Sequence, residues 1–357
     1  MIYAVALAIV LCAIAVDRIS SMRGKRVVLA ACALMLALVP LAVRNDASIN
    51  TLADVGIYVL LALGLNITVG FAGLLDLGYA AFFSIGGYTY GMLASPQFGI
   101  HLPFWGLLFI GAGLAALFGF LLGAPTLRLH GDYLAIVTLG FGLIVPQIFQ
   151  NLTQYTGGPN GISGLDTPSF FGHSFGQSTV PFYYVLLVTV AIVIALVNNL
   201  RNSRLGRGWM AIREDQLAAK HVGINTTGVQ IAAFAFGASI AGLAGVIFAA
   251  KLSLVSPDLF TYQTSILVLS MVVLGGMGNI PGVIIGAVVL ALVNGAVLPQ
   301  INALVNGALH TNLDLTNFNF FIYGAILVAL MLFRPEGVLP NRERQQELHA
   351  AAPPEQA

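Results

Sequence analysis

Residues 201–227 read RNSRLGRGWMAIREDQLAAKHVGINTT. Apolar segments long enough to cross a bilayer flank this stretch on both sides. It holds five of the chain's fifteen basic residues and an adjacent acidic pair, Glu214 and Asp215. We expect a short polar helix outside the membrane that ends at a left-handed Gly223, with Asn225 or Thr226 capping the next segment. A polar loop of this kind in a membrane protein indicates a docking site for a protein partner.

The composition excludes a soluble protein. Only 8% of the residues are charged, and 58% are hydrophobic, whereas soluble domains carry about 25% charged residues. A chain with so few charges cannot cover a surface that faces water. The forty glycines fit helices that approach each other closely inside a membrane.

The apolar pattern predicts an all-α, polytopic helical membrane protein with about ten or eleven transmembrane segments. A span needs roughly 17–25 mostly apolar residues. No basic segment precedes the first apolar run, which argues against a cleaved secretory signal. The candidate spans are 1–16, 27–43, 52–71, 77–94, 104–123, 133–150, 182–200, 229–250, 265–278, 283–305 and 320–333.

The positions of the basic residues predict the orientation. If the N-terminus lies outside, alternation places thirteen of the fifteen Lys and Arg residues in inside loops, and leaves Arg44 and Lys251 outside. Because inside loops of membrane proteins are enriched in Lys and Arg, we expect an outer N-terminus and a cytoplasmic C-terminus.

The chain divides into three predicted parts. Residues 1–46 form a two-helix extension, residues 47–335 a core that contains the 201–227 loop, and residues 336–357 a polar cytoplasmic tail that we expect to be disordered. The longest external loop, residues 151–181, has no Lys or Arg. It forms either an outer cap or docking surface, or a solvated connector with one short helix.

Two stretches interrupt the apolar pattern, at residues 64–88 and 273–287. Helices broken by Gly or Pro at corresponding places in two halves indicate a transport pathway, since irregular backbone at membrane depth must face protein or a water-filled cavity. The alternative is two tight cytoplasmic turns. The pathway candidates are Asn66, Gly70, Gly73, Asp76, Gly275, Gly276, Gly278 and Asn279.

Small residues predict close helix contacts. Gly119 and Gly123, and likewise Gly282 and Gly286, stand four residues apart, and the span 229–250 has a nearly continuous face of Gly, Ala and Ser. We expect Asp54 and Asp132 to serve helix packing. Asp76 is expected to face a turn, a cavity or the cytoplasmic interface. We interpret Cys12 and Cys32 as small core residues.

Several kinds of site are missing from the sequence. The predicted spans contain no cluster of charged residues of the kind that proton-coupled transporters use. The chain has no phosphate-binding loop, because its Gly24–Lys25 pair is followed by Arg26. It also lacks metal-ligand spacing and catalytic residues. We therefore expect a transport subunit that is not an enzyme, and any driving energy must enter through a partner.

The sequence resembles the LivM-type permease subunits of bacterial ABC importers for branched-chain amino acids, in order from about residue 52 to residue 340. The resemblance implies an ABC importer permease fold with Gly-interrupted helices. The matching stretches are GLNITVGFAGLLDLGYAAFFSIGGY (64–88), PTLRLHGDYLAIVTLGFG (125–142), TGGPNGI (156–162), SRLGRGWMAIREDQLAAKHVGINT (203–226), VLSMVVLGGMGNIPGVIIGA (268–287) and LFRPEGVLP (332–340).

This resemblance implies a multi-pass protein of the bacterial inner membrane with a set of partners. They are a second homologous permease, two ABC ATPase subunits that bind ATP and Mg²⁺, a periplasmic substrate-binding protein and membrane lipid, without nucleic acid and without a cofactor on this chain. In such importers a cytoplasmic loop with a Glu-Ala-Ala-x-x-x-Gly pattern couples the permease to the ATPase; here Leu217 stands in place of the Glu. The coupling candidates are Arg204, Arg207, Arg213, Glu214, Asp215, Ala218, Ala219 and Gly223.

The sequence is compatible with more than one class of substrate. Leucine, isoleucine and valine are zwitterions with apolar side chains, so a path without charged residues suits them. Urea and amides, which related importers carry, are also compatible with such a path. The GGMGNIPG stretch, residues 275–282, favours the amino-acid branch. A stand-alone channel for small neutral solutes, or a structural subunit that lines no pathway, remain the alternatives from other classes.

Overall fold

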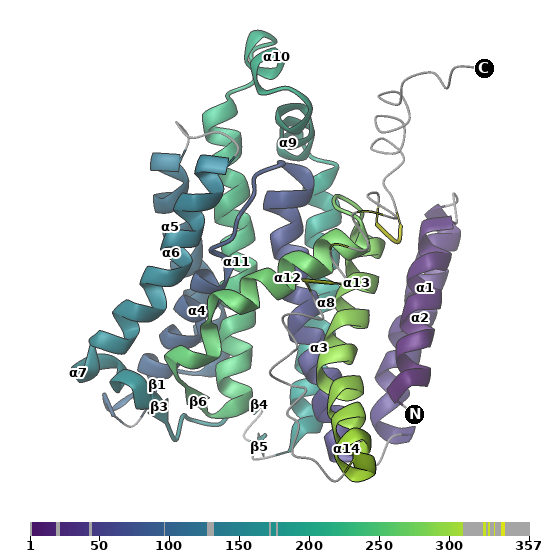
Figure 1. Ribbon diagram of the computed structural model, residues 1–357, viewed down its shortest axis with the longest axis vertical. Coiled ribbons are helices and arrows are strands. Elements are labelled where there is room, and N and C mark those ends of the chain that lie inside the picture. Colours follow the sequence, from purple (N-terminus) through teal and green to yellow (C-terminus); the bar gives the residue numbers. More distant parts are fainter. Residues whose placement is uncertain are drawn as a thin grey trace.

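The computed structural model describes residues 2–18, 22–42, 45–95, 97–126, 132–170, 173–175, 178–309, 324–325, 328, 332 and 337–339. Helices dominate this part of the chain (Figure 1). The α-helices are α1 (Ile2–Arg18), α2 (Met22–Ala42), α3 (Asp46–Leu65), α4 (Tyr79–Leu93), α5 (Phe104–Thr126), α6 (Asp132–Asn151), α7 (Thr153–Thr156), α8 (Thr179–Arg201), α9 (Arg204–Glu214), α10 (Gln216–His221), α11 (Thr226–Leu252), α12 (Tyr262–Gly275), α13 (Ile280–Leu292) and α14 (Leu298–Leu309).

Shorter elements connect the helices. Two π-helices, η1 (Asn66–Phe71) and η4 (Val293–Val297), continue α3 and α13, and two 3₁₀ turns are η2 (Gly158–Asn160) and η3 (Pro257–Phe260). Short antiparallel pairs join β1 (Ala94–Ser95) to β2 (Ile100–His101), β3 (Ile162–Ser163) to β6 (Leu254–Val255), and β4 (Ser169–Phe170) to β5 (His173–Ser174).

The all-α, polytopic fold class predicted from the sequence is confirmed. Within the described residues, seven helices are long and apolar enough to cross a membrane, and Tyr3–Ala15 is a shorter apolar helix. The total of ten or eleven spans stays a prediction. The candidate span 320–333 and the tail lie largely outside the described residues, as does the side chain of Asp132, which the sequence assigns to helix packing.

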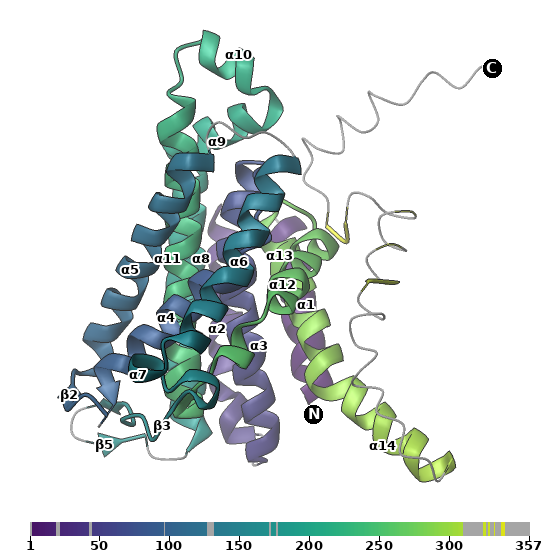
Figure 2. The ribbon, with the colours of Figure 1, turned by 60° about the vertical axis from the view of Figure 1, so that its left-hand side comes forward.

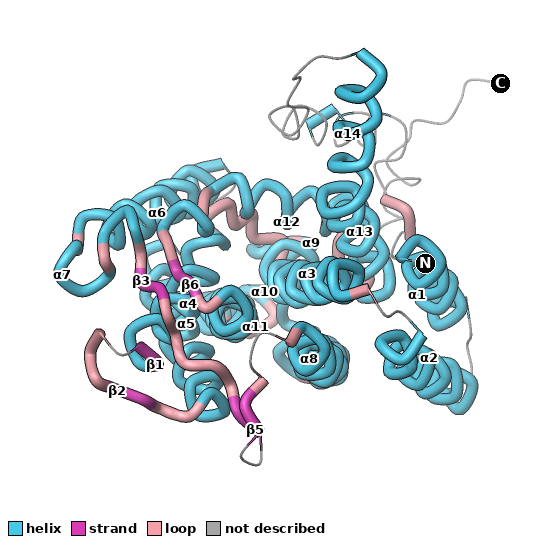
Figure 3. Tube along the Cα trace, turned by 90° about the horizontal axis from the view of Figure 1, so that it is seen from below, coloured by secondary structure: helices cyan, strands magenta, loops and turns pink. Residues whose placement is uncertain are grey.

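Helix α11 occupies the centre of the bundle, between α3 on one side and α4 and α5 on the other (Figure 3). Its small residues allow this position. Gly237 lies against the Gly64 carbonyl of α3, Gly242 against Gly111 and Ala115 of α5, and Gly245 against the Phe83 carbonyl of α4. The predicted small face is confirmed, and it serves several neighbours because three helices pack around α11.

The predicted glycine pairs also form close contacts. A Cβ atom at Gly119 would come 2.7 Å from the Ala238 side chain of α11, so α5 and α11 need a glycine there. Gly282 and Gly286 of α13 lie against the backbone of α12, at Gly275 and Met271. Small residues therefore set the spacing of both helix pairs.

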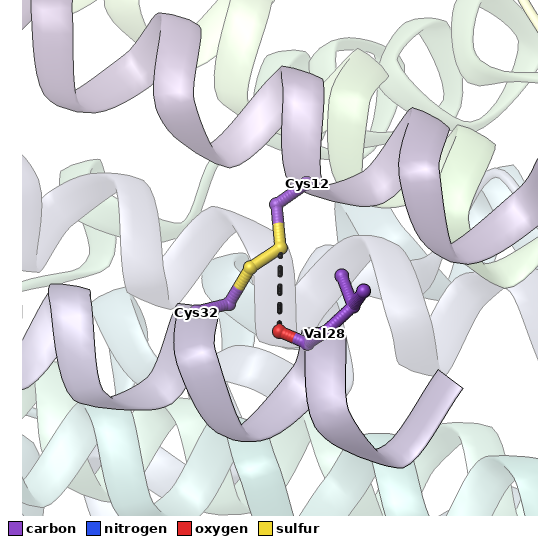
Figure 4. Close-up of a disulfide and its surroundings, with 3 residues drawn as sticks. All are labelled: Cys12, Val28 and Cys32. Carbon is purple, nitrogen blue, oxygen red and sulfur yellow. Dashed lines mark hydrogen bonds between the residues drawn. A yellow bond between two sulfur atoms is a disulfide. The ribbon is translucent and has the colours of Figure 1, made fainter. Parts of the chain in front are cut away.

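Helices α1 and α2 lie side by side at the edge of the bundle (Figure 3). Cys12 and Cys32 join them in a disulfide, with Cα atoms 6.6 Å apart, and the Cys12 Sγ atom lies 3.9 Å from the Val28 carbonyl oxygen (Figure 4). The interpretation of the cysteines as separate small core residues was wrong, because the pairing of the two helices brings them together. On α8, Tyr183 and Tyr184 donate hydrogen bonds to carbonyl groups of α2.

The two ends of the molecule differ in their structure. Helices α9 and α10 project from one end, whereas α7 and the short strands cover the opposite end (Figures 1 and 2). The described part of the loop 151–181 contains the expected short helix, α7, and is tied to the bundle. The Tyr90 hydroxyl donates to the Asp166 carbonyl at 2.5 Å, and the Trp105 ring N–H donates to the Ser169 carbonyl. The described part of this loop is therefore folded against the end of the bundle.

Candidate functional site

The projecting end is built from residues 201–227, which form two helices instead of one. Ser203 caps the start of α9, and its side chain accepts a hydrogen bond from the Gly206 N–H. Trp209 is fully buried and its ring N–H donates to the Val229 carbonyl at 2.7 Å, which fixes α9 on α11. Its large buried surface makes Trp209 the anchor of the loop, a role that the sequence reading missed.

Asp215 lies between α9 and α10 in an extended conformation that separates the two helices. The Asp215 carboxylate accepts hydrogen bonds from the backbone N–H groups of Leu217 and Ala218 and so caps the new helix. The predicted left-handed Gly223 follows its end with φ of 85°, and Asn225 caps α11. The capping predictions for both residues are confirmed.

The surface of α10 combines apolar and polar side chains. Leu217 and Val222 are 69% and 76% exposed, although they stand at the tip of the projection rather than on a membrane span. Lys220 and His221 are exposed beside them. The end of the projection therefore presents two apolar side chains beside polar ones. In the sequence, Leu217 stood out only because it replaces the Glu of the Glu-Ala-Ala-x-x-x-Gly pattern.

The structure divides the coupling candidates into an outer and an inner group. Arg213 is partly buried, and Ala219 is buried between α10 and the rest of the loop. The remaining candidates lie on the exposed surface of α9, of α10 and of the turns beside them: Arg204, Arg207, Glu214, Asp215, Ala218 and Gly223.

Arg213 points from α9 into the bundle. Its guanidinium donates a hydrogen bond of 2.7 Å to the Gly70 carbonyl of η1. Gly73 has φ of 68°, and a Cβ atom there would come 2.9 Å from the Arg213 Cγ atom. Gly73 thus gives the chain a left-handed turn and leaves room for the arginine stem. One coupling candidate and two pathway candidates meet at this point.

A second contact joins the two interrupted stretches. The Asn66 side-chain oxygen accepts a 2.9 Å hydrogen bond from the Gly278 N–H, across 212 positions of the chain. Asn66 is fully buried, and its Nδ2 atom has no hydrogen-bond partner within the described structure. A buried polar group without a partner is uncommon and costs free energy. The buried Asn66 amide is therefore not accounted for by helix packing alone.

The turn between α12 and α13 contains the remaining glycine candidates. Gly276 and Gly278 have φ values of 106° and 84°, which few other residues adopt, and Gly275 lies against Gly282. The segment 337–339 rests on this turn. The Val338 and Leu339 N–H groups donate to the Leu274 and Gly275 carbonyls, and the Asn279 side chain donates to the Leu339 carbonyl.

Asp76 lies in the segment between η1 and α4, away from these hydrogen bonds. It is buried, and one carboxylate oxygen accepts a bond from the Gly78 N–H, so it faces a turn, one of the expected settings. Thr138 and Ser265 accept hydrogen bonds from backbone N–H groups at Leu77 and Ala80 and hold the segment in place. The sequence offered no signal for these two residues.

The end of the bundle opposite α9 and α10 contains an ion pair between Lys251, which the sequence places outside, and Asp54, which it assigns to helix packing. Lys251 of α11 donates to the Asp54 carboxylate of α3 at 2.5 Å, and its side chain is only 6% exposed. Asp54 therefore packs two helices together, as expected. Within the described residues no group of three or more His, Cys, Asp or Glu side chains forms a candidate metal site.

The Arg213 hydrogen bond thus connects the exposed α9–α10 projection to the interrupted helix η1, and the chain is similar in sequence to known proteins. A family model described as branched-chain amino acid transport system, permease component, matches residues 48–331. The chain is 40% identical over 314 residues to the high-affinity branched-chain amino acid transport system permease protein LivM of Salmonella typhimurium; this alignment covers 82% of the chain and 70% of that protein.

Two Escherichia coli K12 proteins are also similar. The chain is 39% identical over 337 residues to the LivM permease protein, covering 88% of this chain and 75% of that one. It is 28% identical over 304 residues to the LivH permease protein, covering 80% and 92%. No solved structure matches the chain.

Proposed function

The chain belongs to the family of permease components of branched-chain amino acid transport systems, and from this premise we propose that it is the transmembrane permease subunit of an ATP-driven, binding-protein-dependent importer. The proposed substrates are leucine, isoleucine and valine or other apolar amino acids. This chain forms part of the translocation pathway, and it hydrolyses no ATP itself. The observation that carries the proposal is the bonded connection from the exposed α9–α10 projection to the interrupted helix η1.

We propose that the ATPase subunits, with their ATP and Mg²⁺, dock on α10. An apolar tip with cationic neighbours suits a groove on a soluble partner. Because Trp209 fixes α9 to α11, a displacement of α10 moves a packed unit rather than a loose loop. Rigid-body motion of this unit would open the pathway alternately to each side.

The remaining partners follow from the family. The chain is similar to both LivM and LivH of one organism, which supports a second, homologous permease beside it. We propose that α7 and the strands face outward and receive a periplasmic binding protein. The excess of Lys and Arg on the α9–α10 side supports a cytoplasmic projection, an outer N-terminus and a cytoplasmic C-terminus.

Labelled leucine and labelled urea test the substrate. The complex of this chain with its second permease and ATPases is placed in proteoliposomes, with binding protein outside and ATP inside. We expect leucine uptake and no urea uptake, and unlabelled isoleucine and valine should compete. Uptake of urea alone would overturn the amino-acid assignment while leaving the transport mechanism in place.

A further inference from the structure

Gly70 is the point at which two long-range hydrogen bonds meet. Its carbonyl oxygen accepts the Arg213 bond from α9. Its Cα packs against the Asn66–Gly278 hydrogen bond, because a Cβ atom at this position would come 2.7 Å from the Gly278 nitrogen and would overlap Asn66 Oδ1. Gly70 therefore contacts both Arg213 of α9 and the turn between α12 and α13.

The elements on the two sides of Gly70 are held in different ways. Helix α9 is held on α11 by the buried Trp209, so Arg213 is attached to a firm support. Gly70 itself lies in a π-helix, a local widening that occurs often at functional sites in helices. The chain then leaves η1 through the left-handed Gly73. A displacement of α9 is expected to deform η1 before it deforms α11.

The second bond extends the connection to the other interrupted stretch. Asn66 begins η1 and holds the Gly278 N–H in the α12–α13 turn. Gly276 and Gly278 in this turn occupy backbone conformations with positive φ, and segment 337–339 is bonded to the same turn. A shift of η1 would therefore be transmitted to the turn through the Asn66–Gly278 hydrogen bond.

We propose that Arg213 and Asn66 form a relay that transmits displacement of α9 through Gly70 to the α12–α13 turn. Both are positioning residues that act through η1. The proposal rests on the proposed function, since it assigns the path by which ATPase movement reaches the pathway. It also makes Arg213 an inward-facing residue of the coupling loop, distinct from the exposed residues that face the partner.

The test measures solute transported per ATP hydrolysed by purified, assembled complexes. Arg213→Met keeps the aliphatic stem on Gly73 and removes the hydrogen-bond donors, whereas Arg213→Lys keeps a charged donor. We expect Arg213→Met and Asn66→Ala each to lower the ratio at least tenfold, and Arg213→Lys to keep at least a third of it. A merely structural role would lower the yield of complex and leave this ratio within twofold of the original, which would overturn the relay.

The double variant gives a second criterion. If the two residues act in series, Arg213→Met with Asn66→Ala lowers the ratio no further than the more severe single change. Multiplying effects would contradict the relay.

A double-mutant cycle on the unfolding temperature of the isolated chain needs no partner. We expect the two changes to lower this temperature by less than the sum of their separate effects. If the two shifts in unfolding temperature add, Arg213 and Asn66 are not coupled, and the relay is overturned even where the complex imports leucine. If the shifts do not add but the complex takes up no solute, the coupling between Arg213 and Asn66 stands and the proposed function is rejected.

Discussion

Single glycines set the closest approaches in this molecule. Gly245 of α11 lies against the Phe83 carbonyl and the Gly87 N–H of α4, and Gly86 lies against Gly242. Because backbones meet here without intervening side chains, each added methyl group must displace a helix. The sequence predicted that α11 would be packed closely, but only the three-dimensional arrangement shows which glycine faces which neighbour.

Substitution of Gly245 tests this packing. Gly245→Ala should destabilise the protein by about 1–3 kcal/mol, since overpacking forces the backbone to shift; thermal unfolding in detergent measures it. Gly113→Ala in α5 is the matched control, because no atom of the described residues lies within 4 Å of a Cβ there. Equal unfolding temperatures for both variants would contradict the packing account.

The Asp54–Lys251 pair gives a second prediction for single residues. Asp54→Asn should lower the unfolding temperature, because it leaves the charge of a largely buried Lys251 without its carboxylate, at a cost of about 1–3 kcal/mol. The double variant Asp54→Asn with Lys251→Met should regain part of that loss, since no buried charge remains. If the double variant is less stable than Asp54→Asn, loss of the ion pair does not explain the lower unfolding temperature of Asp54→Asn.

At the scale of elements, the interrupted helices could be predicted and their partners could not. Gly and Pro spacing marked the breaks after α3 and between α12 and α13. The bond from Asn66 to Gly278 and the bond from Arg213 to Gly70 join residues 212 and 143 positions apart. Periodicity reports local structure, whereas such contacts depend on how distant helices pack. The split of the polar loop into α9 and α10 was missed because Asp215 was interpreted as a contact residue rather than a cap.

Helix α10 provides a prediction at this scale. Leu217→Asp or Val222→Asp should reduce both co-purification with the ATPase subunits and uptake at least tenfold, because a central apolar contact contributes about 2 kcal/mol or more to an interface. The chain should still insert and fold, since both side chains are exposed. Asn202→Asp, an exposed change near the start of α9, is the control. Undiminished co-purification would place the ATPase contact elsewhere.

The whole molecule has a polar projection at one end and a folded cover at the other (Figure 1). Composition alone predicted a polytopic membrane protein, and the basic residues predicted its orientation. The disulfide between Cys12 and Cys32 could not be predicted in this way, since the spacing of two cysteines does not reveal whether their helices pair.

Thiol labelling tests the orientation. In a chain with Cys12→Ala and Cys32→Ala, a membrane-impermeant reagent should label Tyr155→Cys on α7 in spheroplasts and Lys220→Cys on α10 only in inverted vesicles. Both positions are exposed, so access depends on the side of the membrane. The reverse pattern would show that the projection faces outward and would remove α10 from any contact with cytoplasmic ATPases.

The most direct test of the central claim is leucine uptake into proteoliposomes from which one component at a time is omitted. We predict uptake only when this chain, its second permease, the ATPase subunits, the binding protein and ATP are all present. Flux of leucine through this chain alone, at the same rate with and without ATP, would contradict the claim and identify the molecule as a channel.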